Sequence, residues 1–94
     1  MTKYLVERQF HIGEDKMPEV GRRSKELIVG DFPEITWHHS HVVVGDDGLV
    51  KSYCVYEAPD EEMVRRHGEQ LGFHGIVGVY EIAGDVSPED FPLT

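Results

Sequence analysis

The chain has 94 residues, with 18 acidic and 9 basic side chains and a formal net charge of −9 at pH 7. This length suits one domain with one hydrophobic core. The acidic balance argues against a nucleic-acid partner and against an anionic membrane surface, because both are bound through clustered Lys and Arg. We therefore expect a single domain over residues 1–94, with a core over 3–82 and an extended tail over 83–94.

Cysteine content and the start of the chain indicate a compartment. Cys54 is the only cysteine, so no internal disulfide is possible, which fits a reducing cytoplasm. The first ten residues lack the apolar run of a signal peptide, and no apolar stretch is long enough to cross a bilayer. We predict a cytoplasmic protein.

The first third of the chain predicts a strand followed by a helix. Residues 4–10 form a short strand, and a polar segment around Gly13 ends it. Pro18 suits a first helical turn, and Gly30 is a suitable stop. Between them the less polar residues recur at helical spacing: Met17, Val20, Ser24, Leu27 and Ile28.

Two strands, a helix and a last strand are predicted in the rest of the chain. They cover residues 35–44, 49–57, 61–71 and 76–82. The Gly-Asp-Asp-Gly segment at 45–48 is typical of a hairpin turn between the first two. Asp60 is a suitable N-cap for the helix, and Gly72 is suited to its C-terminal end.

The resulting order is β-α-β-β-α-β, the ferredoxin-like arrangement of an α+β domain. Such a domain has one antiparallel sheet with both helices on one face. The other face would be left in water, and an exposed apolar sheet face favours association. We therefore predict a homodimer in which a second copy covers that face.

Three histidines lie close together in the segment Trp-His-His-Ser-His at residues 37–41. Strand side chains alternate, so His39 and His41 are predicted to share one face. A loop over 45–48 would set His39 opposite Cys54, whereas a two-residue turn at Asp47-Gly48 would set His41 beside Cys54. In both registers the two histidines and the cysteine share a face.

Two imidazoles and a thiol on one face suit a divalent transition metal such as nickel, copper or zinc. The spacing matches no closed four-ligand zinc signature. The alternative is structural: half-buried histidines with satisfied ring nitrogens, beside a cysteine that packs as a small hydrophobe.

Two further positions carry polar groups toward the core. His67 lies between Val64 and Leu71 on the apolar stripe of the second helix, so it points toward the sheet. It is either a hydrogen-bonded core histidine or a ligand or general base beside a cavity. Glu7 and Arg8 are neighbours in the first strand, so one of them faces inward and needs a partner.

Three segments resemble one known family. Residues 30–42 (GDFPEITWHHSHV) are similar to its "G-P-E-I-x-W-x-x-S" pattern, and residues 51–59 (KSYCVYEAP) to its "K-x-Y-C-V-Y-x-A-P" strand. Residues 61–67 (EEMVRRH), followed by Gly72-Phe73, resemble its second helix. The family consists of small, largely uncharacterised bacterial proteins and is typified by a nickel-binding, ferredoxin-like dimer.

The resemblance implies a dimeric α+β barrel and nickel binding, with His39, Cys54 and His67 at matching ligand positions. Its pattern also matches three neighbours of these ligands: Trp37, Ser40 and Tyr53. The chain departs from the pattern at His41, where the family prefers Tyr or Phe, and at His74, where it usually has Pro. Both departures add imidazoles.

We therefore predict a small, non-enzymatic protein that sequesters or responds to nickel or a similar divalent metal. The predicted ligands are His39, His41, Cys54 and His67. The alternative is a dimeric barrel that acts as an enzyme or binds a small organic molecule, with His67 or His39 as a base. Its pocket would be lined by Trp37, Ser40, Tyr53 and Tyr56.

Overall fold

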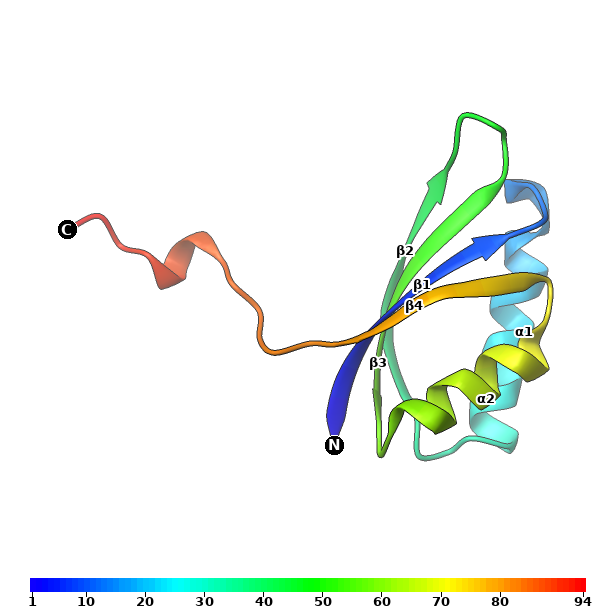
Figure 1. The fold of residues 1–94 in the computed structure, drawn as a ribbon, viewed down its shortest axis with the longest axis horizontal. Helices are drawn as coiled ribbons and strands as arrows, with labels where there is room; N and C mark the ends of the chain where they lie inside the picture. Colours follow the sequence, from blue (N-terminus) through cyan, green and yellow to red (C-terminus); the bar gives the residue numbers. More distant parts are fainter.

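The computed structural model describes residues 1–94 and contains one antiparallel sheet and two α-helices (Figure 1). The sheet order is β2-β3-β1-β4. In chain order the elements are β1 (Thr2–Phe10), the 3₁₀ turn η1 (Glu14–Lys16), α1 (Met17–Gly30), β2 (Thr36–Val44), β3 (Val50–Ala58), α2 (Glu61–Leu71), β4 (His74–Glu81) and the 3₁₀ turn η2 (Pro88–Asp90). This confirms the predicted ferredoxin-like β-α-β-β-α-β order.

Both helices lie against one face of the sheet, and the chain leaves the other face open (Figure 1). We call the sheet face that the helices cover the helix face. Because strand side chains alternate between the two faces, every second residue of a strand lies on it. The even-numbered residues of β1 from Tyr4 onward and all of those in β3 are buried. The main core cluster consists of Tyr4, Val6, Phe32, Ile35, Cys54, Tyr56, Ala58 and Val64.

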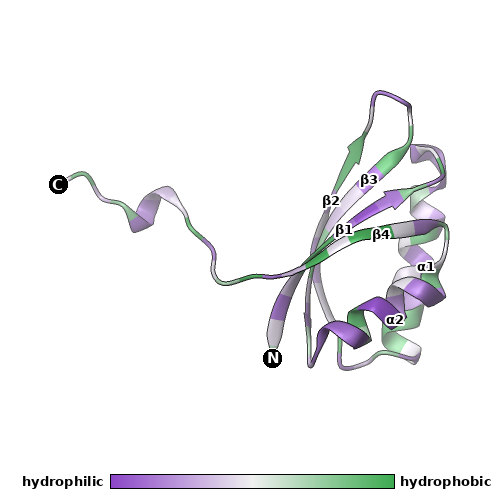
Figure 2. Ribbon diagram, in the orientation of Figure 1, coloured by the Kyte–Doolittle hydropathy of each residue, from purple (hydrophilic) through white to green (hydrophobic).

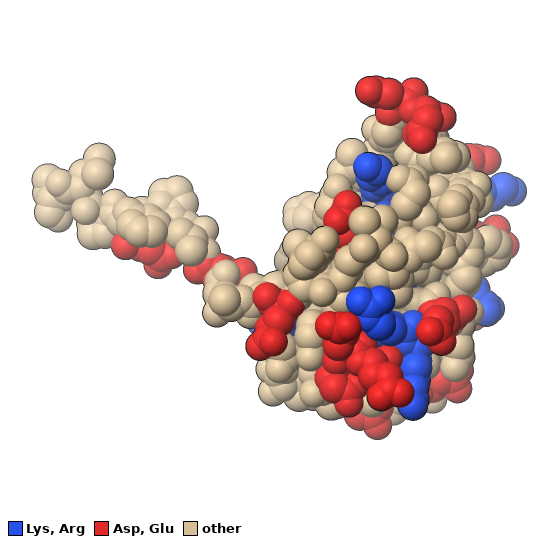
Figure 3. Space-filling model, viewed as in Figure 1, with Lys and Arg blue, Asp and Glu red and all other residues tan.

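The second helix begins and ends as its sequence predicts. The Asp60 side chain accepts a hydrogen bond from the Met63 backbone N–H at 2.9 Å, which satisfies one free amide of the first turn. Gly72 ends the helix with φ of 71°, which favours glycine. The outer surface of α2 is hydrophilic (Figure 2) and carries both acidic and basic side chains (Figure 3), and Arg65 and Arg66 pair with the glutamates four residues before them.

The hairpin between β2 and β3 has an odd loop, so both predicted registers are wrong for the part of β2 from His39 to Val44. The Gly45 N–H donates to the Leu49 carbonyl, and the Gly48 N–H donates to the Gly45 carbonyl. Three residues therefore lie between Gly45 and Leu49, with Gly48 at φ of +80°, as in a type I turn followed by a left-handed residue. Val44 pairs with Val50. A one-residue slip moves every partner to the opposite face.

A bulge interrupts the alternation of side chains within β2. Val42 down to His39 pair in register with Ser52 to Val55, but Trp37 pairs with Tyr56, so His38 is the extra residue. As a result Trp37 and Ser40 both face the helices. His39 and His41 face the open side of the sheet.

The tail leaves the sheet after one last ladder bond, from the Ile82 N–H to the Lys3 carbonyl. Residues beyond it extend away from the body of the domain (Figure 1). Val86, Phe91 and Leu93 are exposed along it. None of the helices has the length and apolar character that a membrane span requires.

Candidate functional site

The open sheet face carries a pair of adjacent imidazoles. His39 and His41 lie two residues apart on β2, and their ring centroids are 5.3 Å apart with the planes at 81°. Both side chains are exposed. The histidine rings that hydrogen-bond within the chain are those of His38, His67 and His74. The ring nitrogens of the pair are therefore free to bind a ligand.

Rows of paired residues fix the surroundings of this pair on the open face. His39 pairs with Val55, Val55 with Leu5, and Leu5 with Tyr80, so these four residues cross all four strands. Tyr80 is half-exposed, and Leu5 and Val55 are only partly buried. The imidazole pair thus lies at one end of an apolar row that no element of this chain covers.

Cys54 does not join the histidine pair, and the expectation of a shared face is wrong. Its strand partner is Ser40, and antiparallel partners share a face. The thiol is buried on the helix face, 3.4 Å from the Ser52 hydroxyl. The odd hairpin loop is the physical reason, because it moves the β2 partner of Cys54 from a histidine to Ser40.

His67 faces the sheet, as its position on the helical stripe predicts. Its side chain is fully buried, its Nε2 is 3.2 Å from the Ser24 hydroxyl, and its Nδ1 has no partner. The ring contacts Phe32 and Tyr56 edge-on. Burial, and to a lesser degree the nearby Arg8 charge, lowers the pKa of His67 to about 4. His67 is therefore a neutral core histidine at pH 7.

The four predicted metal ligands divide between the two faces of the sheet. His39 and His41 lie on the open face, and Cys54 and His67 lie on the helix face. No group of three or more His, Cys, Asp or Glu side chains comes together within the chain. One ion therefore cannot be bound by all four residues of a single chain.

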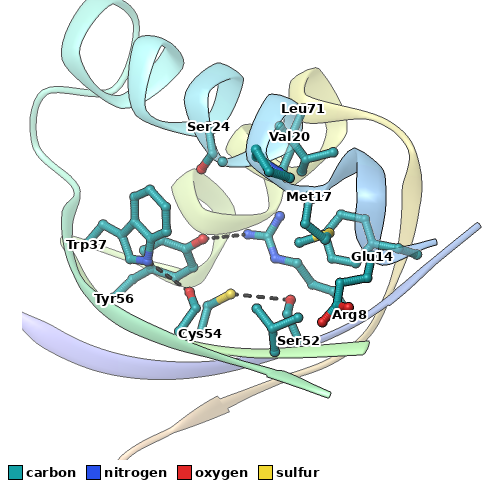
Figure 4. Close-up of a pocket in the computed structure, with 15 residues that line it drawn as sticks. Arg8, Glu14, Met17, Val20, Ser24, Trp37, Ser52, Cys54, Tyr56 and Leu71 are labelled. Carbon is teal, nitrogen blue, oxygen red and sulfur yellow. Dashed lines mark hydrogen bonds between the residues drawn. The ribbon is translucent and has the colours of Figure 1, made fainter. Parts of the chain in front are cut away.

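A cavity of about 480 Å³ lies on the helix face, between α1 and the strands β1, β2 and β3 (Figure 4). Three of the four predicted pocket residues, Trp37, Ser40 and Tyr56, line it. Tyr53 does not, because it pairs with His41 on the open face. The lining residues are Arg8, Phe10, Glu14, Met17, Pro18, Val20, Gly21, Ser24, Trp37, Ser40, Val42, Ser52, Cys54, Tyr56 and Leu71.

Of the two charged neighbours in β1, Arg8 points toward the helices and Glu7 faces the open side. The Arg8 guanidinium extends into the cavity (Figure 4) and donates to the Tyr56 hydroxyl at 3.2 Å. Another guanidinium nitrogen is 3.1 Å from His74 Nε2, while Nε has no partner. Arg8 lies 5.5 Å from the centroid of the Tyr56 ring, which adds a cation–π contact.

Sequence reasoning indicated that either Glu7 or Arg8 needs an inward partner, but not which residue supplies it. His74 departs from the family pattern and adds an imidazole, and the structure makes it a neighbour of Arg8. Its Nδ1 lies 2.6 Å from the Gly72 carbonyl. Burial, together with Arg8, lowers the pKa of His74. Ser52 was missed as a cavity residue, because nothing in its spacing distinguishes it from a strand residue of the core.

Comparison with known proteins assigns the chain to a family. The model of the family described as "Nickel responsive protein SCO4226-like" matches residues 4–76, which is more than half of the chain. Among curated proteins, none matches. The family match covers β2, β3 and both α-helices in full and β1 and β4 in part, and it confirms the resemblance drawn from the sequence motifs. The chain belongs to the SCO4226-like nickel responsive protein family.

Proposed function

We propose that this protein binds nickel or a similar divalent transition metal on the open face of its sheet, through His39 and His41, and acts in sequestration or response rather than catalysis. The observation that carries the proposal is the adjacency of two exposed imidazoles without intrachain hydrogen bonds. Imidazole nitrogen is a ligand that suits nickel, copper and zinc. The family name supports nickel among these metals.

Two imidazoles leave part of the coordination sphere of the ion to be filled. Nothing else in the same chain supplies a third protein ligand beside them. We propose that a second copy, packed through the open sheet faces, brings its own histidines or leaves room for water. The apolar row of Leu5, Val55 and Tyr80 supports this homodimer, because it leaves apolar area in water that a second sheet would bury.

Calorimetric titration of the tag-free protein with Ni²⁺ tests the proposal. We expect stoichiometric binding at micromolar metal, weakened at least about tenfold in His39→Ala and in His41→Ala, since each removes one ligand, and a tenfold loss equals about 1.4 kcal/mol. Absence of binding at micromolar Ni²⁺ would overturn the proposal.

His38→Ala is the matched control for these variants. His38 is the same residue type in the same strand, but its Nε2 is bonded to the Glu57 carboxylate at 2.9 Å. We expect its removal to leave the affinity for Ni²⁺ within about threefold of the parent, well under the 1.4 kcal/mol of a tenfold change. An equal loss in His38→Ala would point to non-specific binding by a histidine-rich strand.

A further inference from the structure

The cavity beneath α1 holds a buried positive charge that the proposed metal site does not use. We propose that this cavity binds a small organic molecule with one carboxylate and an apolar body, and that Arg8 recognises the carboxylate. The cavity lies on the helix face, opposite His39 and His41. This inference is therefore independent of the proposed metal site.

Arg8 is buried without a counter-charge. Only 1% of its surface is exposed, yet it takes part in none of the ion pairs of the chain, which join His38 to Glu57, Arg65 to Glu61 and Arg66 to Glu62. A buried charge is costly unless it is paired. Its Nε is also without a hydrogen-bond partner. Both facts favour the binding of an anion with acceptor oxygens.

The groups around the guanidinium do not supply that anion. Burial raises the pKa of the Tyr56 phenol far above its ordinary value, so the hydroxyl keeps its proton. Burial also lowers the pKa values of His67 and His74, and neutral imidazoles carry no charge. The immediate neighbours of Arg8 are therefore uncharged at pH 7. An incoming carboxylate would meet a single cation.

The rest of the cavity determines the kind of molecule. Phe10, Met17, Val20, Trp37 and Leu71 give it largely apolar walls, and its volume of about 480 Å³ falls within the range of small-molecule sites. The hydroxyl of Ser52 supplies polar contact near the sheet, and Figure 4 shows it on the Arg8 side of the cavity. One cation in apolar surroundings favours a singly charged amphipathic molecule over a phosphate, which carries more charge.

Glu14 is the one carboxylate that lines the cavity. It belongs to η1, its side chain is exposed, and it forms no ion pair with Arg8. If Glu14 served as the missing counter-charge in solution, an external carboxylate would have to displace it. Glu14→Gln separates the two cases. Octanoate should bind this variant with an affinity within about threefold of that of the parent chain, whereas a gain of about tenfold or more would identify Glu14 as the counter-charge of Arg8 and overturn the premise that Arg8 has none.

Octanoate and its uncharged analogue octanamide test the proposal on the unmodified protein. Trp37 is the only tryptophan and lines the cavity, so its fluorescence reports occupancy, and calorimetry gives the affinity. We expect octanoate to bind at least about tenfold more tightly than octanamide at fixed ionic strength, because only the carboxylate pairs with Arg8.

Substitution of Arg8 assigns that preference to the guanidinium. In Arg8→Met the difference between octanoate and octanamide should fall to about twofold or less, well under the tenfold step of 1.4 kcal/mol. Arg8→Lys should retain part of it. Arg65→Met removes an exposed arginine that pairs with Glu61, and it should leave the difference unchanged. If Arg8→Met fails to fold, the two probes on the parent chain still decide the matter.

Three results would overturn the proposal. Octanoate and octanamide could bind the parent chain equally, or octanoate could fail to bind at millimolar concentration. Inorganic phosphate could also bind more tightly than octanoate through Arg8, which would assign the cavity to phosphate instead. Tighter binding of octanoate that is lost in Arg8→Met and kept in Arg65→Met supports the proposal.

Discussion

Ser40 lies directly opposite Cys54 across β2 and β3, and both side chains face the helices. The histidines on either side of this position in the pairing, His39 and His41, therefore point to the opposite face. The Cys54 thiol and the imidazole pair are separated by the thickness of the sheet backbone. They belong to different environments, one buried and one exposed.

This separation predicts that nickel binding does not depend on the thiol. Cys54→Ser should retain an affinity for Ni²⁺ within about threefold of the parent, under the 1.4 kcal/mol that a tenfold change represents. The serine hydroxyl occupies nearly the same volume beside Ser52. Calorimetric titration of the reduced protein checks this. A loss as large as that in His39→Ala would place the thiol in the metal site.

The row of Leu5 and Val55 predicts the effect of a charge on the dimer. Val55→Lys should shift the protein toward monomer, because a lysine at the centre of a buried sheet face would lose hydration without a partner. Analytical ultracentrifugation over a dilution series measures the shift. Val29→Lys is the matched control, since Val29 is 71% exposed and lies on α1, away from the open face. Identical association of both variants would contradict a dimer through this face.

Acidification should destabilise the fold through His67. Its pKa is lowered from 6.5 to about 4 in the folded chain. Below pH 6.5 the unfolded chain therefore takes up a proton that the folded chain does not accept until about pH 4. The free energy of unfolding should fall by about 2 kcal/mol between pH 7 and pH 4.5 from this residue. The lowered pKa of His74 acts in the same direction.

Urea unfolding at a series of pH values, in the presence of a metal chelator, measures this dependence. His67→Leu should flatten it over the window from pH 6.5 to 4. Val29→Leu, at an exposed side chain that does not titrate, should leave the slope as it is in the parent. An unchanged slope in His67→Leu would mean that another group takes up the proton.

The hairpin that orients the histidines depends on Gly48. Its φ of +80° costs a residue with a side chain about 1 kcal/mol or more. Gly48→Ala should therefore lower the free energy of unfolding by about that amount. Gly84→Ala is the control, because it lies in the tail and a Cβ there meets nothing within 4 Å. Equal stability of the two variants would show that the turn tolerates the change.

Periodicity and turn residues were sufficient to predict the order of elements and most of their bounds. They also predicted that His67 points toward the sheet, because only one face of this helix carries apolar residues at helical spacing and His67 lies on it. Strand register is a different problem. The Gly-Asp-Asp-Gly segment is compatible with loops of two, three or four residues, and the parity of that number decides which side chains share a face.

The bulge at His38 also changes which side chains of β2 share a face, and a strictly alternating pattern does not predict a bulge. Without it Trp37 would point away from the helices, and with it Trp37 packs against Tyr56, with ring centroids 6.4 Å apart.

The orientation of Arg8 could not be predicted from the sequence either. Either Glu7 or Arg8 had to face inward, and the pairing of β1 with β3 decides that it is Arg8.

The extra residue in β2 also has an evolutionary consequence. Gain or loss of a single codon at position 38 would move the β2 side chains that precede it from one sheet face to the other, while the rest of the strand would still align. In a relative without that residue, the tryptophan equivalent to Trp37 would face the open side, while histidines equivalent to His39 and His41, on the hairpin side of the bulge, would keep their face. Ligand sets in such proteins are inherited only together with their strand pairing.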